Sequence, residues 1–174
     1  MADARHYPSI SWIDSYTEYL PDIEDWWNDL DSRWLSVRSE AMNILLEDNR
    51  LQQVVKLVGS DALPPAQQFV LFVAEMIKNA FLQQNAFDPM DKYCSPEKQV
   101  KLLAAILDLY HRGADLLKAG VTVKQIAALD VVSEMVRLKS EVPNRELDQI
   151  DAYSRRLAEG LDALRTQEMP GESA

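Results

Sequence analysis

The residues of this chain best suited to bind a ligand are two phenylalanines that flank a short polar stretch. Phe81 and Phe87 enclose Leu82-Gln83-Gln84-Asn85-Ala86, and a new helical pattern begins after Ser95. Aromatic rings at such a corner either pack in the core or form a platform on which a planar ring such as adenine can stack. The residue types and spacing leave both interpretations open.

Histidine offers little further chemistry. The histidines are His6 and His111, and Asp108 lies three residues before His111, as in a metal site of a helical bundle. A carboxylate-bridged di-iron site would need a second such pair, and His6 belongs to an extended pattern. We therefore favour a surface histidine over a ligand and expect no metal.

The single cysteine, Cys94, excludes a disulfide within the chain and indicates a reducing, cytoplasmic setting. Lys92 and Lys98 are near it in sequence but no histidine is, which favours a partly buried structural thiol over a nucleophile. The sequence has no G-x-x-x-x-G-K-[ST] loop to hold a triphosphate. We expect no catalytic residue and no self-sufficient active site.

Composition narrows the function further. A chain of 174 residues with 47% hydrophobic content suits one compact domain with a core. A net charge of -10 argues against nucleic acid and against anionic membrane surfaces. The longest clear apolar run, Phe69 to Ala74, is far shorter than the ~20 residues of a membrane-spanning helix, so we expect no direct membrane insertion.

The elements that must position these residues all read as helices, and no strand alternation occurs. The expected helices are a short acidic one from Pro21, one from a Ser32 cap to Gly59, one from about Pro65 to Gln83, one from Ser95 to Gly120, one from a Thr122–Gln125 capping box to about Lys139, and one along Leu147–Leu164. We predict an all-α bundle of about six helices over residues 21–165, with an irregular linker over 1–20 and a disordered tail over 166–174.

Two surfaces suggest partners. Seven acidic residues and no basic residue lie between Asp14 and Asp31. We favour the interpretation that these residues form a solvated face, and the alternative is that they bind a basic partner surface. A narrow seam of coiled-coil type could also bind another helix; it consists of Leu147, Ile150, Leu157, Leu161 and Leu164.

Four segments together resemble the C-terminal helical domain of the catalytic subunit, or alpha chain, of archaeal-type and vacuolar-type rotary ATP synthases and ATPases. They are Arg5–Trp12, Leu51–Pro64, Phe81–Phe87 and Tyr93–Gln99. The resemblance extends from Arg5 to about Leu164, and it is most specific in the first 110 residues.

The resemblance implies a fragment of a catalytic subunit that has its P-loop core elsewhere and binds ATP or ADP with Mg there. Partners would be the B subunits and the central stalk, in a cytoplasmic complex peripheral to a membrane. Phe87, with Phe81 as the alternative ring, would lie over adenine. The rotor-facing loop would comprise Ser60, Asp61, Ala62, Leu63, Pro64 and Pro65. By itself the chain would have no cofactor and no catalysis.

Only Asp61 is charged in this loop, so a rotor contact there would rely on shape and stiffness. Pro64 and Pro65 fix φ near about -65°. Leu63 is expected to be an exposed apolar contact, because nothing nearby in the sequence can bury it. The alternative function is a free-standing helical adaptor that binds a partner through the Leu147–Leu164 seam.

Overall fold

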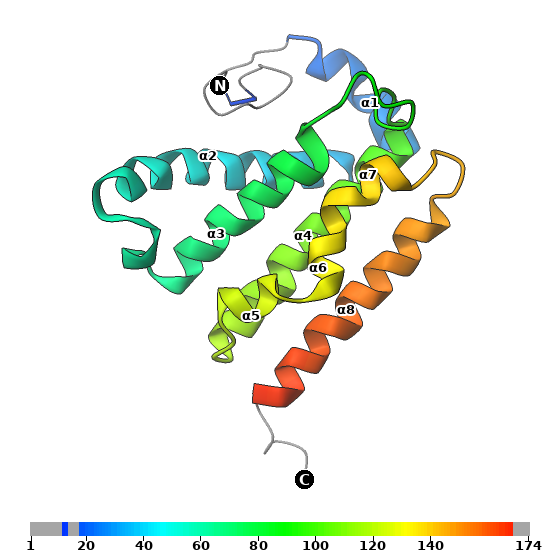
Figure 1. Ribbon diagram of the computed structural model, residues 1–174. Coiled ribbons are helices and arrows are strands. Elements are labelled where there is room, and N and C mark those ends of the chain that lie inside the picture. Colours follow the sequence, from blue (N-terminus) through cyan, green and yellow to red (C-terminus); the bar gives the residue numbers. More distant parts are fainter. Residues whose placement is uncertain (1–11, 14–17, 169–174) are drawn as a thin grey trace.

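The computed structural model describes residues 12–13 and 18–168, and every regular element in this part of the chain is helical. The longer helices are α1 (Leu20–Leu30), α2 (Trp34–Val58), α3 (Pro65–Met76), α4 (Pro96–Lys118) and α8 (Asp148–Glu168). A π-helix (Ile77–Leu82) continues α3 (Figure 1). The predicted all-α bundle is confirmed. Predictions for the remaining residues, including His6, Asp14 and most of the linker and tail, lie outside the described residues.

Most helix starts follow local signals. Pro65 begins α3, and the Ser95 side chain accepts a hydrogen bond from Lys98 N at the start of α4, as predicted. Gly59, with φ of 82°, ends α2. The prediction of a Ser32 cap is wrong: α2 begins at Trp34 without a side-chain cap.

The residue that orders the turn before α2 is Asp31 rather than Ser32. Its carboxylate accepts hydrogen bonds from Arg33 N at 2.9 Å and from Arg33 Nη2 at 2.8 Å. These bonds hold the pKa of Asp31 below its ordinary value. Because the Asp31 carboxylate binds both the backbone N and the guanidinium of Arg33, this turn is ordered without a hydrogen bond from Ser32.

The single helix predicted from Thr122 to Lys139 is also wrong. The capping box of Thr122 and Gln125 is present, but α5 (Val123–Ala127) is followed by α6 (Asp130–Glu134), a 3-10 turn (Met135–Arg137) and α7 (Leu138–Glu141). A straight helix would spread the apolar side chains of this segment around most of its circumference. With the breaks, Ile126, Val132, Met135 and Leu138 are buried, whereas Val136 remains exposed.

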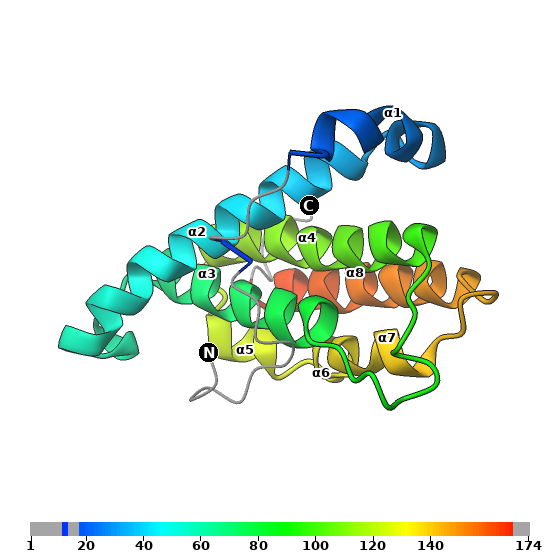
Figure 2. The same ribbon diagram turned by 90° about the horizontal axis from the view of Figure 1, so that it is seen from above.

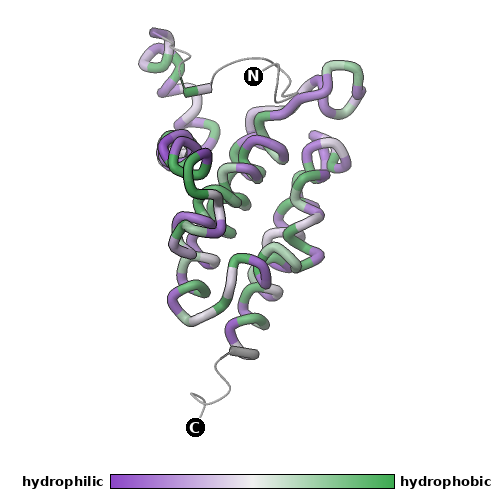
Figure 3. Tube along the Cα trace, turned by 60° about the vertical axis from the view of Figure 1, so that its left-hand side comes forward, coloured by the Kyte–Doolittle hydropathy of each residue, from purple (hydrophilic) through white to green (hydrophobic). Residues whose placement is uncertain are grey.

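The core lies along α4, which packs against α2, α3 and α8. Hydrophobic segments of these helices face one another in the interior (Figure 3). Phe69 of α3 lies directly over Gly113 of α4, where an added Cβ would be 2.2 Å from the Phe69 Cζ. The ring also stacks on Tyr110, with centroids 6.2 Å apart. Glycine therefore permits the close crossing of α3 and α4.

The seam along α8 is used inside the protein. Ile150, Leu157 and Leu161 are buried in the core, and Leu147 and Leu164 pack against it. The expectation that this seam is free to bind a partner is therefore wrong. Helix α4 covers it, since α4 and α8 lie side by side along their lengths (Figures 1 and 2).

Candidate functional site

Phe87 projects into solvent from an ordered corner between the π-helix and α4. Its side chain is 94% exposed. The corner is held by short side-chain caps: Asn85 Oδ1 accepts from Phe87 N at 3.0 Å, and Asp88 Oδ1 accepts from Met90 N at 2.7 Å. Such Asx turns fix local backbone geometry. An aromatic ring kept out of the core on a fixed turn is available to a ligand or a partner.

A polar hollow of about 510 Å³ lies beside this ring. It is lined by Asn79, Gln83, Gln84, Asn85, Phe87, Asp91, Val136, Lys139 and Ser140. The ring supplies one apolar edge, and the amide and hydroxyl groups supply donors and acceptors. This combination suits a flat ligand with a polar rim. Lys139 and Asp91 were not singled out by the sequence, because they come from segments far apart in the chain.

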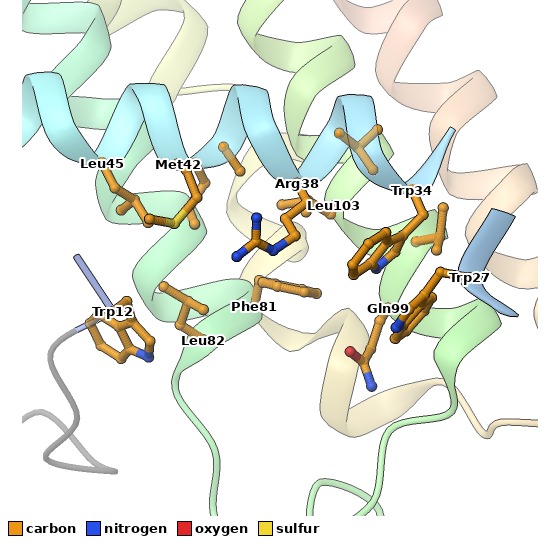
Figure 4. Close-up of a pocket in the computed structure, with 14 residues that line it drawn as sticks. Trp12, Trp27, Trp34, Arg38, Met42, Leu45, Phe81, Leu82, Gln99 and Leu103 are labelled. Carbon is orange, nitrogen blue, oxygen red and sulfur yellow. The ribbon is translucent and has the colours of Figure 1, made fainter. Parts of the chain in front are cut away.

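Phe81 occupies a different environment. It is half-buried against the core and lines an apolar groove of about 370 Å³ between α2, the π-helix and α4. In Figure 4 its ring lies inside this groove, near Arg38 and Trp34. The two phenylalanines therefore separate into a packing ring and an exposed ring, a distinction that the sequence left open.

Tryptophan side chains line the same groove together with aliphatic ones (Figure 4). Trp27 and Trp34 stack with ring centroids 4.6 Å apart and planes 9° apart, and the Arg38 guanidinium lies 5.9 Å from the Trp34 centroid. No local sequence pattern indicates this groove. Its walls belong to helices that meet only in the folded chain.

The loop between α2 and α3 differs from the expectation at one residue. Ser60, Asp61, Ala62, Pro64 and Pro65 are exposed, as a contact with a partner would require. Leu63 is not: only 7% of it is exposed, so the predicted apolar contact at Leu63 is wrong. The Gln68 Nε2 donates to Leu63 O at 2.8 Å, and the 3-10 turn Ser60–Ala62 folds the leucine back against the protein. The exposed position that the local sequence predicts for Leu63 is therefore replaced by a buried one.

The apolar surface at this end belongs to α2 instead. Leu57 is 85% exposed, and Val54 and Val58 are exposed beside it. The end of α2 extends beyond the other helices (Figure 2), so these side chains are not covered by any helix in the described part of the chain. We call Val54, Leu57, Val58 and Ser60–Ala62 the α2 tip.

The remaining reactive residues do not converge. His111 is on the surface as expected, with Nε2 2.6 Å from Glu40 Oε1, and Asp108 pairs with Arg112 at 2.9 Å. Within the described residues no cluster of three or more His, Cys, Asp or Glu side chains could hold a metal ion. Cys94 is half-buried, and burial raises the pKa of its thiol, which agrees with a structural role.

The acidic residues of α1 face solvent. Helix α1 contributes no buried residue, and Asp22, Asp25 and Asp29 are exposed to solvent, as the solvated-face interpretation predicts. Among the helices described, none is long and apolar enough to span a bilayer.

Comparison with known proteins gives a consistent result over most of the chain. The family described as "C-terminal domain of V and A type ATP synthase" matches residues 24–127. The chain is 42% identical over 166 residues to a subunit of the A-type ATP synthase of Methanopyrus kandleri, and 39% identical over 165 residues to a V-type ATP synthase alpha chain of Halothermothrix orenii. Each alignment covers 94% of this chain but 28% of the relative's length.

Proposed function

The chain belongs to the family of C-terminal domains of V- and A-type ATP synthases, and from this premise we propose that it couples nucleotide binding to the central stalk. In the complete catalytic subunit it would supply one wall of the adenine pocket at Phe87. At the α2 tip it would contact the stalk. The B subunits would be its other partners, and the complex would sit at the cytoplasmic face of a membrane.

The observation that supports this proposal is that one rigid helix joins the two candidate sites. Helix α3 and the π-helix run without interruption from Pro65, next to the α2 tip, to Leu82, next to the Phe87 corner. At ~1.5 Å per residue this rod is about 27 Å long. Its Phe69, Val73 and Ala80 are buried in the core, so the rod moves with the whole bundle.

At the base end, the Phe87 ring would stack on the face of adenine. Stacking requires no hydrogen bond and is equally available to ATP and ADP. The phosphates and Mg would be held by the P-loop core of the complete subunit, which supplies the catalytic groups. This chain contributes base contact and movement, and we expect it to have no hydrolytic activity by itself.

At the stalk end, the α2 tip would transmit the movement by shape. Asp61 is the charged residue of the loop, whereas Val54, Leu57 and Val58 form an exposed apolar surface. Rigid-body displacement of the bundle when the core closes on nucleotide would press this surface against the stalk. Pro64 and Pro65 stiffen the turn between tip and rod.

The base contact is tested by Phe87→Ala in the complete subunit. Loss of one stacking ring should weaken ADP binding by about 1–3 kcal/mol, which corresponds to roughly a 5- to 150-fold higher Kd. Tyr93→Ala is a matched control, because Tyr93 is also exposed, at 64%, but does not line the hollow beside Phe87. Calorimetric titration with ADP provides the measurement.

Phe81→Ala should produce the opposite pattern, because this ring packs against the core. We expect a loss of about 3 kcal/mol in unfolding free energy with little change in ADP affinity. If Phe81 controlled affinity while Phe87 controlled stability, the assignment of the exposed ring to the base would be overturned.

A further inference from the structure

A buried ion pair braces the corner that carries Phe87. Lys139, at the start of α7, and Asp91, at the end of the corner, are each only 7% exposed. The Lys139 Nζ lies 3.1 Å from Asp91 Oδ1. Both residues also line the hollow beside Phe87. The pair therefore joins the corner to a helix that is remote from it in the sequence.

The pair binds the backbone of the corner at three points. Lys139 Nζ donates to the carbonyl oxygens of Phe81, at 3.1 Å, and of Gln83. Carbonyls at a helix C-terminus have no partner within the helix, so the ammonium satisfies groups that would otherwise be unpaired. Asp91 Oδ2 accepts from Asn85 N at 2.5 Å. The start, middle and end of the corner are thus tied to one cation and its counter-ion.

Lys139 is itself held in place. The fully buried Lys98 of α4 donates from Nζ to Lys139 O at 2.7 Å and to Val142 O at 2.6 Å. These contacts fix the backbone of α7 against α4. The backbone from which the Lys139 side chain extends is therefore anchored to the core of the bundle.

The Lys139–Asp91 pair is better suited to orient the corner than to stabilise the fold. Removing two charges from water is costly, and apolar side chains of similar volume can hold segments together at least as well. The pair instead fixes the conformation of the corner. Lys139 must reach two particular carbonyls and Asp91 one particular amide, which restricts the backbone to one conformation. Phe87 lies in that corner, two residues after Asn85.

We propose that Lys139 and Asp91 are positioning residues that hold the Phe87 ring ready for the nucleotide base, an inference that rests on the proposed function. Neither residue stacks on the base. Without the Lys139–Asp91 pair the Phe87 ring is still present, but the ring and its turn must become ordered when the nucleotide binds. Ordering one side chain and its turn weakens base binding by about 2- to 13-fold, while contacts to the phosphates are unaffected.

The test compares two ligands in the complete subunit within the assembled ATPase. The Kd of ADP reports base and phosphate contacts, and the Kd of pyrophosphate, both with Mg, reports phosphate contacts alone. Lys139→Met should raise the Kd of ADP about 2- to 13-fold and leave that of pyrophosphate unchanged. Lys139→Arg, which keeps the cation, should recover most of the ADP affinity. Lys101→Met is the matched control, since it removes the Lys101–Asp151 pair between α4 and α8.

Lys139→Met leaves the Asp91 carboxylate buried without a cation, so the variant can fail to fold. The double variant Lys139→Met with Asp91→Asn removes both charges and keeps an acceptor for Asn85 N. It should fold and still raise the ratio of the Kd of ADP to the Kd of pyrophosphate. An unchanged ratio in this variant, when Phe87→Ala raises it, would overturn the positioning role alone. An unchanged ratio in Phe87→Ala would overturn the proposed base contact and this inference with it.

Discussion

Replacing Leu63 by alanine tests whether the turn at the α2 tip is anchored from inside. The substitution removes three carbon atoms from a side chain that is 7% exposed. At about 0.8 kcal/mol per buried methylene, the transfer term is roughly 2.4 kcal/mol. A cavity term raises such losses to about 2–5 kcal/mol in well-packed cores. Leu63 does not belong to the main core cluster. Outside a tightly packed core the surroundings can relax into the void, so we expect the free energy of unfolding to fall by about 2–3 kcal/mol.

Urea unfolding followed by circular dichroism measures this loss. Leu57→Ala is the matched control, because the same three atoms are removed from a side chain that is 85% exposed. It should change the unfolding free energy by less than about 0.5 kcal/mol. If Leu63→Ala were as neutral as Leu57→Ala, the leucine would be free at the surface, and the structural reasoning about this turn would be refuted.

The remaining predictions concern the core. Gly113→Ala would place a methyl group 2.2 Å from the Phe69 Cζ, and it should lower the urea unfolding free energy by about 1–3 kcal/mol; a neutral result would contradict the close crossing of α3 and α4. Burial raises the pKa of Tyr153 above its ordinary value of 10.0, while its hydroxyl donates to Val131 O at 2.6 Å. Because the pKa of Tyr153 is higher in the folded than in the unfolded chain, its contribution to the free energy of unfolding is complete below pH 10.0 and decreases as pH rises further. Urea midpoints above that pH should fall less steeply in Tyr153→Phe, and equal slopes would contradict the assignment.

Local chemistry made part of the fold predictable. Ser95 followed by proline, and the Thr122–Gln125 box, define helix starts within four residues of chain, so the sequence is sufficient to locate them. The division of the 122–139 segment was not predictable in the same way. It depends on which neighbours the apolar side chains must reach, and those neighbours lie in other helices.

The candidate site shows the same limit. Phe81 and Phe87 were identified from the sequence, but only packing distinguishes the half-buried ring from the exposed one. Leu63 was expected at the surface because burial there requires contacts beyond the loop. The Lys139–Asp91 pair had no signal at all, since nothing in either local sequence indicates a partner in the other.

The most direct test of the coupling proposal is a crosslink from the α2 tip in the assembled ATPase. Ala62 is exposed on this tip, and Ala62→Cys would be introduced with Cys94→Ser and without other reactive cysteines. The cysteine is labelled with a thiol-reactive photo-crosslinker, the complex is irradiated during ATP turnover, and the crosslinked subunit is identified. The proposal predicts a crosslink to the central stalk. A crosslink only to a neighbouring catalytic or peripheral subunit would contradict it.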